Sequence, residues 1–152
     1  MIRPLAVQGN ALAQYNLGVS YDLGWGVPQN AAEAIKWYRP AADQGYSLAQ
    51  QNLGDIYATG RGVTADIAEA LKWYRVAADQ GNPFAQNSLG LMYEKGQGVP
   101  ADLVRADMWF NLSGAQGNDT GLKNRIRAAG LMTKEQVAEA QKLARDWKPT
   151  AR

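Results

Sequence analysis

The chain has 152 residues, of which 46% are apolar and 20% charged, and its formal net charge is +2. No run of about 20 apolar residues and no long polar tract occurs, so we expect a folded protein and neither a disordered chain nor one inserted in a membrane. The absence of cysteine and histidine excludes disulfides, thiolate nucleophiles, most zinc sites and histidine-based acid–base catalysis. The small net charge gives no reason to expect a nucleic-acid partner.

A 36-residue sequence recurs along most of the chain. Its three copies are residues 9–44, 45–80 and 81–116. Residues 1–8 align with the last eight residues of a copy, so the chain begins in mid-repeat and we expect a trimmed N-terminus, which makes the lack of a signal peptide uninformative. A fixed period of this length is typical of a solenoid, in which each unit buries its apolar face against its neighbours. We therefore predict one elongated repeat domain over residues 1–152, with residues 117–152 as C-terminal capping helices.

Two helices per copy are predicted, because small and apolar residues recur at helical spacing. The first helices are expected at residues 11–23, 47–59 and 83–95. They should end at Gly24, Gly60 and Gly96, since glycine accepts the left-handed conformation after a helix. Gly18, Gly54 and Gly90 fall in mid-helix, where glycine costs about 0.5–1 kcal/mol relative to alanine. These three glycines predict a close approach of a neighbouring helix.

The second helix of each copy is predicted to begin after an N-cap residue, namely Asn30, Asp66 and Asp102. Glu33 and Glu69 stand three residues after the first two caps and predict capping boxes there. Aromatic residues recur at fixed positions and are predicted to anchor the core. They are Tyr21, Tyr57 and Tyr93, then Trp37, Trp73 and Trp109, and then Tyr38, Tyr74 and Phe110.

After Gly117 the pattern fails, since Arg125 and Ile126 replace the Leu–Gly pair of the copies. Two final helices are predicted in the segments LKNRIRAAGLM and TKEQVAEAQKLARDW. Thr133 should cap the second of them, with Glu135 one residue short of a capping box. Residues 117–152 hold 8 Lys/Arg against 4 Asp/Glu, which we interpret as the solvated outer face of an end cap.

The copies follow the pattern A-x-A-Q-x-x-L-G-x-x-Y-x-x-G-x-G-V and then A-x-x-W-Y-x-x-A-A-x-Q-G, with few departures. This pattern resembles the Sel-one-like repeat (SLR) family, a relative of the tetratricopeptide repeats (TPR), and the tail resembles the ending of its bacterial members. The resemblance implies an all-α solenoid, a right-handed superhelix of αα-hairpins whose first helices line a concave surface. It also implies an adaptor, regulator or inhibitor, including immunity proteins that act against secreted toxins.

Positions that differ among the copies are not required for stacking, so they are the candidates for partner recognition. By the TPR-like layout, the concave surface should carry Leu12, Tyr15, Val19, Asp22, Leu48, Gln51, Asp55, Phe84, Asn87, Leu91 and Glu94. Leu12, Leu48 and Phe84, together with Tyr15, Val19 and Leu91, are predicted to form an apolar stripe with an acidic margin at Asp22, Asp55 and Glu94. Alternatively, Leu12, Leu48 and Phe84 pack against the preceding copy. Trp25, in the loop after the first helix, is a further candidate.

Nothing in the sequence predicts catalysis. The paired glycines of the loops follow helices and no GK[ST] occurs, so we interpret them as turns and not as a phosphate-binding loop. We expect a non-catalytic, monomeric scaffold that binds a protein or peptide without a metal or cofactor. The alternative is a binder of a small ligand or cell-wall fragment, or a penicillin-recognising enzyme. The branch of the family that resembles such enzymes has paired cysteines, and this chain has no cysteine. The absence of cysteine leaves the compartment open between the cytoplasm and the periplasm or export.

Overall fold

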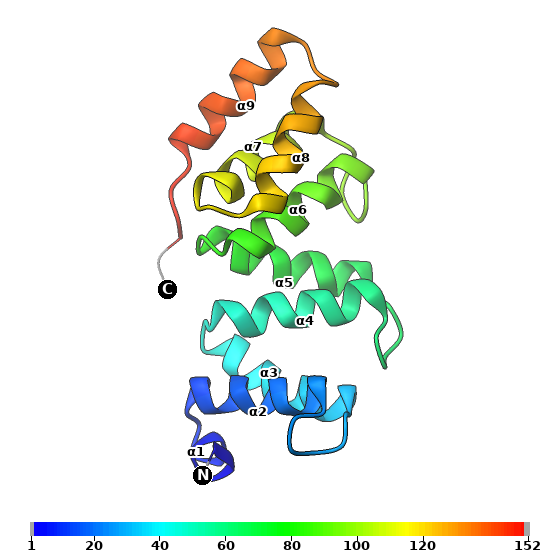
Figure 1. Cartoon of the computed structure of the whole chain (residues 1–152), viewed down its shortest axis with the longest axis vertical. Helices are drawn as coiled ribbons and strands as arrows, with labels where there is room; N and C mark the ends of the chain where they lie inside the picture. The colour runs from blue at the N-terminus through cyan, green and yellow to red at the C-terminus, as the bar shows by residue number, and fades with distance from the viewer. Residues whose placement is uncertain (1, 151–152) are drawn as a thin grey trace. The chain divides into compact units, whose positions relative to one another are not determined.

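The computed structural model describes residues 2–150, and all regular secondary structure in that range is helical (Figure 1). Met1 and residues 151–152, which the predicted domain includes, lie outside the described residues. The helices are α1 (Ile2–Val7), α2 (Ala11–Leu23), α3 (Ala31–Asp43), α4 (Ser47–Thr59), α5 (Ile67–Asp79), α6 (Pro83–Lys95), α7 (Leu103–Ala115), α8 (Asp119–Ala129) and α9 (Lys134–Asp146). The predicted all-α class of successive helical hairpins is confirmed.

The chain divides into two compact units, residues 1–73 and residues 74–152, and the boundary falls inside α5. In the first unit, α2 packs against α1 and α3, and α3 packs against α4. In the second unit, α7 contacts α6, α8 and α9. The single repeat domain stays a prediction, and each unit is described by itself. No helix among residues 2–150 is both long enough and apolar enough to cross a bilayer.

The predicted ends of the first helices are confirmed. Gly24, Gly60 and Gly96 adopt φ values of 73°, 68° and 68°, in the left-handed region where a Cβ would be strained. Each second helix also begins where predicted, because the side chains of Asn30, Asp66 and Asp102 accept from the N–H three residues later at 3.0–3.1 Å.

The predicted capping boxes at Glu33 and Glu69 are wrong. The cap N–H groups of Asn30 and Asp66 donate instead to the carbonyls of Tyr21 and Tyr57, at 2.8 and 2.9 Å. No donor is left for a returning carboxylate, and the Glu69 carboxylate accepts from the indole N–H of Trp73 at 3.1 Å. A capping box does form at the start of α9, where Thr133 and Gln136 bond reciprocally. Gln136, and not Glu135, stands three residues after Thr133 at the spacing that a capping box requires.

The close approach predicted by the mid-helix glycines is confirmed at two of them. A Cβ on Gly18 would lie 2.5 Å from the ring of Tyr38, and a Cβ on Gly90 would lie 2.5 Å from the ring of Phe110. Both rings are buried. Each glycine thus lets an aromatic ring of the second helix pack directly on the backbone of the first, and this burial offsets the low helix propensity of glycine.

Polar side chains join neighbouring helices at repeated positions. The Arg39 guanidinium donates to the Tyr57 hydroxyl at 2.9 Å, and Arg75 donates to Tyr93 in the same way at 3.1 Å. A glutamine in each first helix donates to a carbonyl near the end of the preceding helix, where backbone acceptors lack an intrahelical partner. These bonds run from Gln14 to Ala6, from Gln50 to Ala42 and from Gln86 to Ala78.

The final helices follow the structural pattern of the repeat further than their sequence indicates. Asn118 caps α8 by accepting from Gly121 N–H at 2.8 Å, and it stands 36 residues after Asn82, which caps α6. The helix therefore begins in the register of a first helix, although its sequence departs from the pattern. In α9, Ala140 is buried, and Trp147, the residue after the helix, meets the ring of Trp109 edge-on at 6.1 Å.

Candidate interaction surface

Three side chains of the predicted apolar stripe are exposed, and the other three, Tyr15, Val19 and Leu91, are half-buried. Leu12, Leu48 and Phe84 are 52%, 37% and 55% exposed, and each is the second residue of its helix. The alanines that follow them, at positions 13, 49 and 85, are buried. None of the three side chains is fully buried against the preceding copy. Leu12 and Leu48 lie in the first unit and Phe84 in the second, and their arrangement as one stripe stays a prediction. Its role in partner binding stays a prediction.

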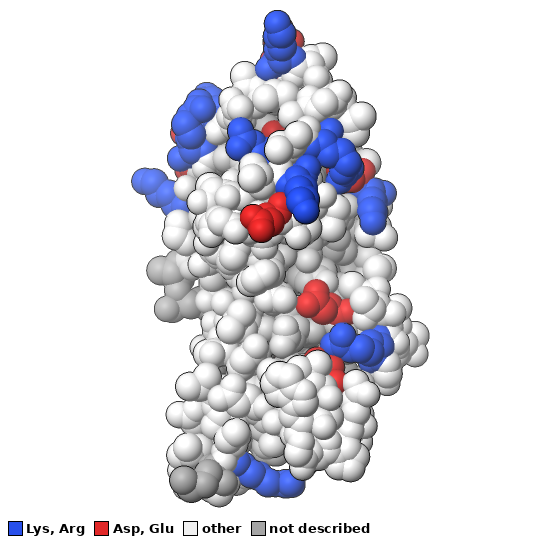
Figure 2. All heavy atoms as spheres, in the orientation of Figure 1, with Lys and Arg blue, Asp and Glu red and all other residues white. Residues whose placement is uncertain are grey.

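In the first unit, this surface continues into a cluster of tyrosines. The ring of Tyr15 lies 5.0 Å from that of Tyr46 and 5.9 Å from that of Tyr38. Asn52 donates to the Tyr38 hydroxyl at 3.1 Å, and burial raises the pKa of Tyr15. In Figure 2, residues other than Lys, Arg, Asp and Glu cover most of the visible area over α2. Val19 is half-buried in the same helix.

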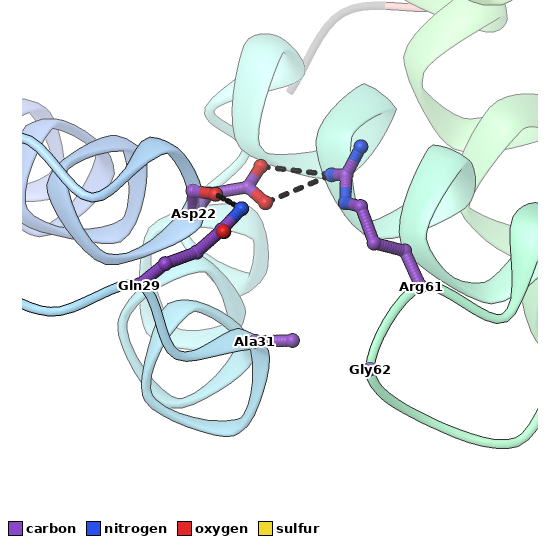
Figure 3. Close-up of a pocket in the computed structure, with 5 residues that line it drawn as sticks. All are labelled: Asp22, Gln29, Ala31, Arg61 and Gly62. Atoms are coloured by element: carbon purple, nitrogen blue, oxygen red, sulfur yellow. Dashed lines mark hydrogen bonds and ion pairs between the residues drawn. The ribbon is translucent and has the colours of Figure 1, made fainter.

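Asp22, predicted to belong to an acidic margin, is held inside the first unit (Figure 3). Its carboxylate is buried, accepts from the Tyr38 hydroxyl at 3.2 Å and pairs with the Arg61 guanidinium at 2.9 Å. Burial raises the pKa of Tyr38 above its usual range, and the negative charge of the nearby Asp22 carboxylate adds a smaller increase. Gln29 donates to the Asp22 carbonyl. Asp22, Gln29 and Arg61 line a cavity of about 250 Å³, in which the charges of Asp22 and Arg61 neutralise each other.

The second unit repeats this neutralisation with other residues. Glu94 pairs with Arg127 of α8 at 2.9 Å, and Arg127 also donates to Asn124 at 3.3 Å. Asn124 in turn donates to the buried Asn87 at 2.7 Å, which completes a polar chain between α6 and α8. Asn124 and Arg127 were not predicted as part of this surface, since only the cap at Asn118 reveals that α8 keeps the first-helix register. Leu91 is half-buried beside this chain.

The remaining predicted residues are more dispersed. Asp55 accepts from Gln51, four residues earlier in α4, at 3.3 Å. Trp25 is exposed in the loop that follows α2, two residues after the exposed Leu23. No cluster of three or more carboxylates, histidines or cysteines suited to a metal occurs among residues 2–150.

Two of the stripe residues border hollows in the surface. Leu12 lines a mostly apolar cavity of about 550 Å³ together with Ile2 and Leu5 of α1. Phe84 lines a cavity of about 400 Å³ together with Thr120, at the start of α8. Both hollows place open space beside an exposed apolar side chain, as is common where a partner's side chain is received.

The third copy differs from the first two in having a buried carboxylate. Asp107 replaces the aliphatic residues Ile35 and Leu71 of the earlier copies, and one of its oxygens has no hydrogen-bond partner. Burial raises its pKa, while the bond from Asn111 at 3.0 Å and the charge of Arg125 act in the opposite direction.

The raised pKa of Asp107 predicts a pH-dependent stability. The folded state binds the Asp107 proton more tightly than the unfolded chain, in which the pKa of this carboxyl is near the usual 3.8. Protonation of Asp107 therefore stabilises the folded state below pH 3.8. That stabilisation is lost as the pH rises through the folded-state pKa. In Asp107→Asn the ionisation is removed. Urea denaturation should show the variant gaining stability relative to the wild type between pH 4 and 7, whereas a difference that is constant from pH 3 to 7 would contradict the assignment.

Successive αα-hairpins with a variable, exposed first-helix surface define a helical-repeat protein. The Sel1 repeat model matches residues 11–46, 47–82 and 83–118, and the chain belongs to the Sel1 repeat family. Sel1 repeats typically mediate protein interactions, and proteins built from them are generally non-catalytic scaffolds. The predicted SLR resemblance is thereby confirmed.

Two bacterial crystal structures are similar to this chain. A Sel1 repeat protein from Oxalobacter formigenes is 43% identical with a TM-score of 0.76, over 83% of this chain and 95% of that one. A protective antigen present in uropathogenic Escherichia coli strains, which displays an SLR fold, is 32% identical with a TM-score of 0.70, over 96% of this chain and 39% of that one. No curated protein sequence matches the chain.

Proposed function

We propose that this chain is a non-catalytic scaffold that binds a protein or peptide through its first helices, α2, α4 and α6. The observation that carries the proposal is the exposure of a large apolar side chain at the same position of all three helices, at Leu12, Leu48 and Phe84. The stacking of repeats does not require these side chains to be exposed, and exposed apolar positions of this kind often mark partner sites. A regulator, or an inhibitor of the toxin-immunity type, would use the same surface.

The charges around this surface support a polypeptide partner over a small polar ligand. Asp22 and Glu94 are each paired with an arginine at 2.9 Å, so the charge of each carboxylate is neutralised within the protein. What the first helices offer to a partner is mainly apolar and aromatic. Aromatic side chains are enriched among the few residues that carry most of the free energy of protein–protein binding.

The test is the double variant Leu48→Glu with Phe84→Glu. Both side chains are exposed, so the charges stay hydrated and the melting temperature should stay near that of the wild type. Binding of a partner recovered by affinity pulldown and then purified should weaken by at least about 2 kcal/mol, because apolar anchors are replaced by carboxylates. Isothermal titration calorimetry measures the affinity, and circular dichroism measures the melting temperature.

A matched control replaces Leu143 and Leu131 with Glu. These side chains are 38% and 64% exposed, close to Leu48 and Phe84, but they lie in α9 and in the segment before it. The control should keep full affinity. Full affinity in the well-folded Leu48/Phe84 variant would contradict the proposed surface and direct attention to Trp25, whereas a large loss of stability in that variant would show that the two side chains are needed for packing.

A further inference from the structure

Helix α8 begins in the register of a first helix, but no second helix among residues 2–150 packs along it as α7 packs along α6. In the copies the second helix covers one side of the first, as α3 covers α2. The last helix, α9, packs against α7 instead, and Figure 1 shows it running apart from α8 beyond the turn that joins them. One side of α8 therefore lacks the cover that α2 and α6 have.

Two apolar residues of α8 stand at positions that are covered in the copies. Ile126 is 36 residues after Gly90, on which the Phe110 ring of α7 packs. Leu122 is 36 residues after Gln86, which is fully buried. In α8 the Ile126 side chain is 66% exposed and the Leu122 side chain is 42% exposed. The two residues are four apart and so lie on one face of the helix, where they form an exposed apolar ridge, called here the α8 ridge.

Packing within the second unit does not explain the α8 ridge. The buried residues of α8 are Gly121 and Ala128, and Gly121 lies against Ser113 of α7. The ridge residues are exposed instead, although the terminal helices of a repeat array normally turn polar residues outward. Isolated exposed apolar residues are common, whereas neighbouring ones with a polar rim often mark an interaction site.

Positive charges border the α8 ridge on both sides. By helical geometry, Lys123 and Arg127 lie along one edge of the ridge, and the half-buried Arg125 lies along the other. Figure 2 shows Lys and Arg side chains gathered over α8. Arg127 is paired with Glu94, but Lys123 is exposed and forms no ion pair with another described residue. The single acidic residue of α8 is Asp119, in its first turn, so the rim of the ridge is basic.

We propose that the α8 ridge docks an acidic amphipathic helix of another protein, in the place that a second helix takes in the copies. The occupant is a helix because Ile126 and Leu122 stand at positions that α7 covers on α6 or that are buried there. It is acidic because the rim is basic, and for the same reason the ridges of two copies of this chain would repel each other. The ridge does not include Leu12, Leu48 or Phe84, so this inference is independent of the proposed function.

The test uses the fluorescent peptide Ac-Glu-Leu-Leu-Glu-Ala-Leu-Glu-Glu-Leu-Leu-Glu-Ala-Leu-Glu-NH2, whose helix has a leucine face bordered by glutamates. Two control peptides replace every Glu with Lys or every Leu with Ala. Fluorescence anisotropy with the full chain should show the acidic peptide binding at least about tenfold more tightly than either control. Its binding should weaken as salt is raised from about 50 to about 500 mM, because the charges that border the ridge are exposed.

The double variant Leu122→Gln with Ile126→Gln separates docking from folding. Glutamine is the residue that the copies carry at the position of Leu122, and both side chains are exposed, so the melting temperature should stay within about 4 °C of the wild type. Affinity for the acidic peptide should fall at least about tenfold. Lys123→Glu should also weaken the peptide, by at least about threefold, whereas Lys142→Glu, the same charge change on α9, should stay within about twofold of the wild type.

Several results would overturn the docking site. These are equal binding of the acidic and lysine peptides, no binding of the acidic peptide at about 1 mM, an unchanged affinity in the glutamine double variant, or a fall of more than about 10 °C in its melting temperature. A wild-type dimer in sedimentation velocity that the glutamine double variant abolishes would show that the ridge joins two copies. Peptide binding that is lost in the Leu48/Phe84 double variant and kept in the glutamine double variant would place the peptide on the first helices, which refutes the α8 site and supports the proposed function.

Discussion

Phe110→Ala is expected to lower the free energy of unfolding by about 3–5 kcal/mol, the usual cost of removing a large buried aromatic side chain. The Phe110 ring is fully buried and lies against the backbone of Gly90, so its loss leaves a cavity between α6 and α7 that neither helix can fill. Urea denaturation followed by circular dichroism measures the change.

The chain contains its own matched control for this experiment. Phe84 is the only other phenylalanine, and it is 55% exposed where Phe110 is 0% exposed. Phe84→Ala should change the free energy of unfolding by less than about 0.5 kcal/mol, as is usual for surface substitutions. If the two variants were destabilised equally, Phe84 would be a packing residue, and the predicted apolar stripe would lose one of its members.

Ending the chain at Gly130 should have the second large effect on folding. The truncation removes α9 and Trp147, and so exposes the ring of Trp109 against which Trp147 packs at 6.1 Å. Terminal repeats depend on a polar outer face for solubility, so we expect this shortened protein to self-associate. Light scattering and circular dichroism measure its size and melting.

A chain ending at Lys148 is the control for the truncation. It retains α9 and Trp147 and loses only the final segment, with its bond from Thr150 N–H to the Asp79 carbonyl at 2.7 Å. It should stay monomeric and melt near the wild type. A chain ending at Gly130 that behaved in the same way would show that α9 does not cap the repeats.

The helix boundaries could be predicted because local residues determine them. Gly24 ends α2 by adopting the left-handed conformation, and Asn30 caps α3 through a bond within one turn, so both effects depend on a few neighbouring residues. Gly18 was equally informative, since its cost in mid-helix required a compensating contact, and the Tyr38 ring provides one. The repetition of these residues at a spacing of 36 strengthened each inference.

The polar contacts could not be predicted in the same way, because their partners are distant in the sequence. Asp22 pairs with Arg61, 39 residues later, and Glu94 with Arg127, 33 residues later, so two acids of the predicted margin are neutralised by side chains that no local pattern connects to them. The capping box at Glu33 failed for a related reason, since the carbonyl of Tyr21 takes the N–H that the box would use. Leu48 and Phe84, which sequence variation among the copies singled out, are exposed, and their role in partner recognition stays a prediction.

The most direct test of the central claim, that the first helices bind a polypeptide, is hydroxyl-radical footprinting of the protein with and without its purified partner. Leucine, tyrosine, phenylalanine and tryptophan side chains all react, so mass spectrometry reports on each surface in one experiment. We predict that the partner protects Leu12, Leu48 and Phe84 from oxidation and leaves Leu131 and Trp25 unchanged. Protection of Trp25 or Leu131, with Leu12, Leu48 and Phe84 still fully reactive, would contradict the claim.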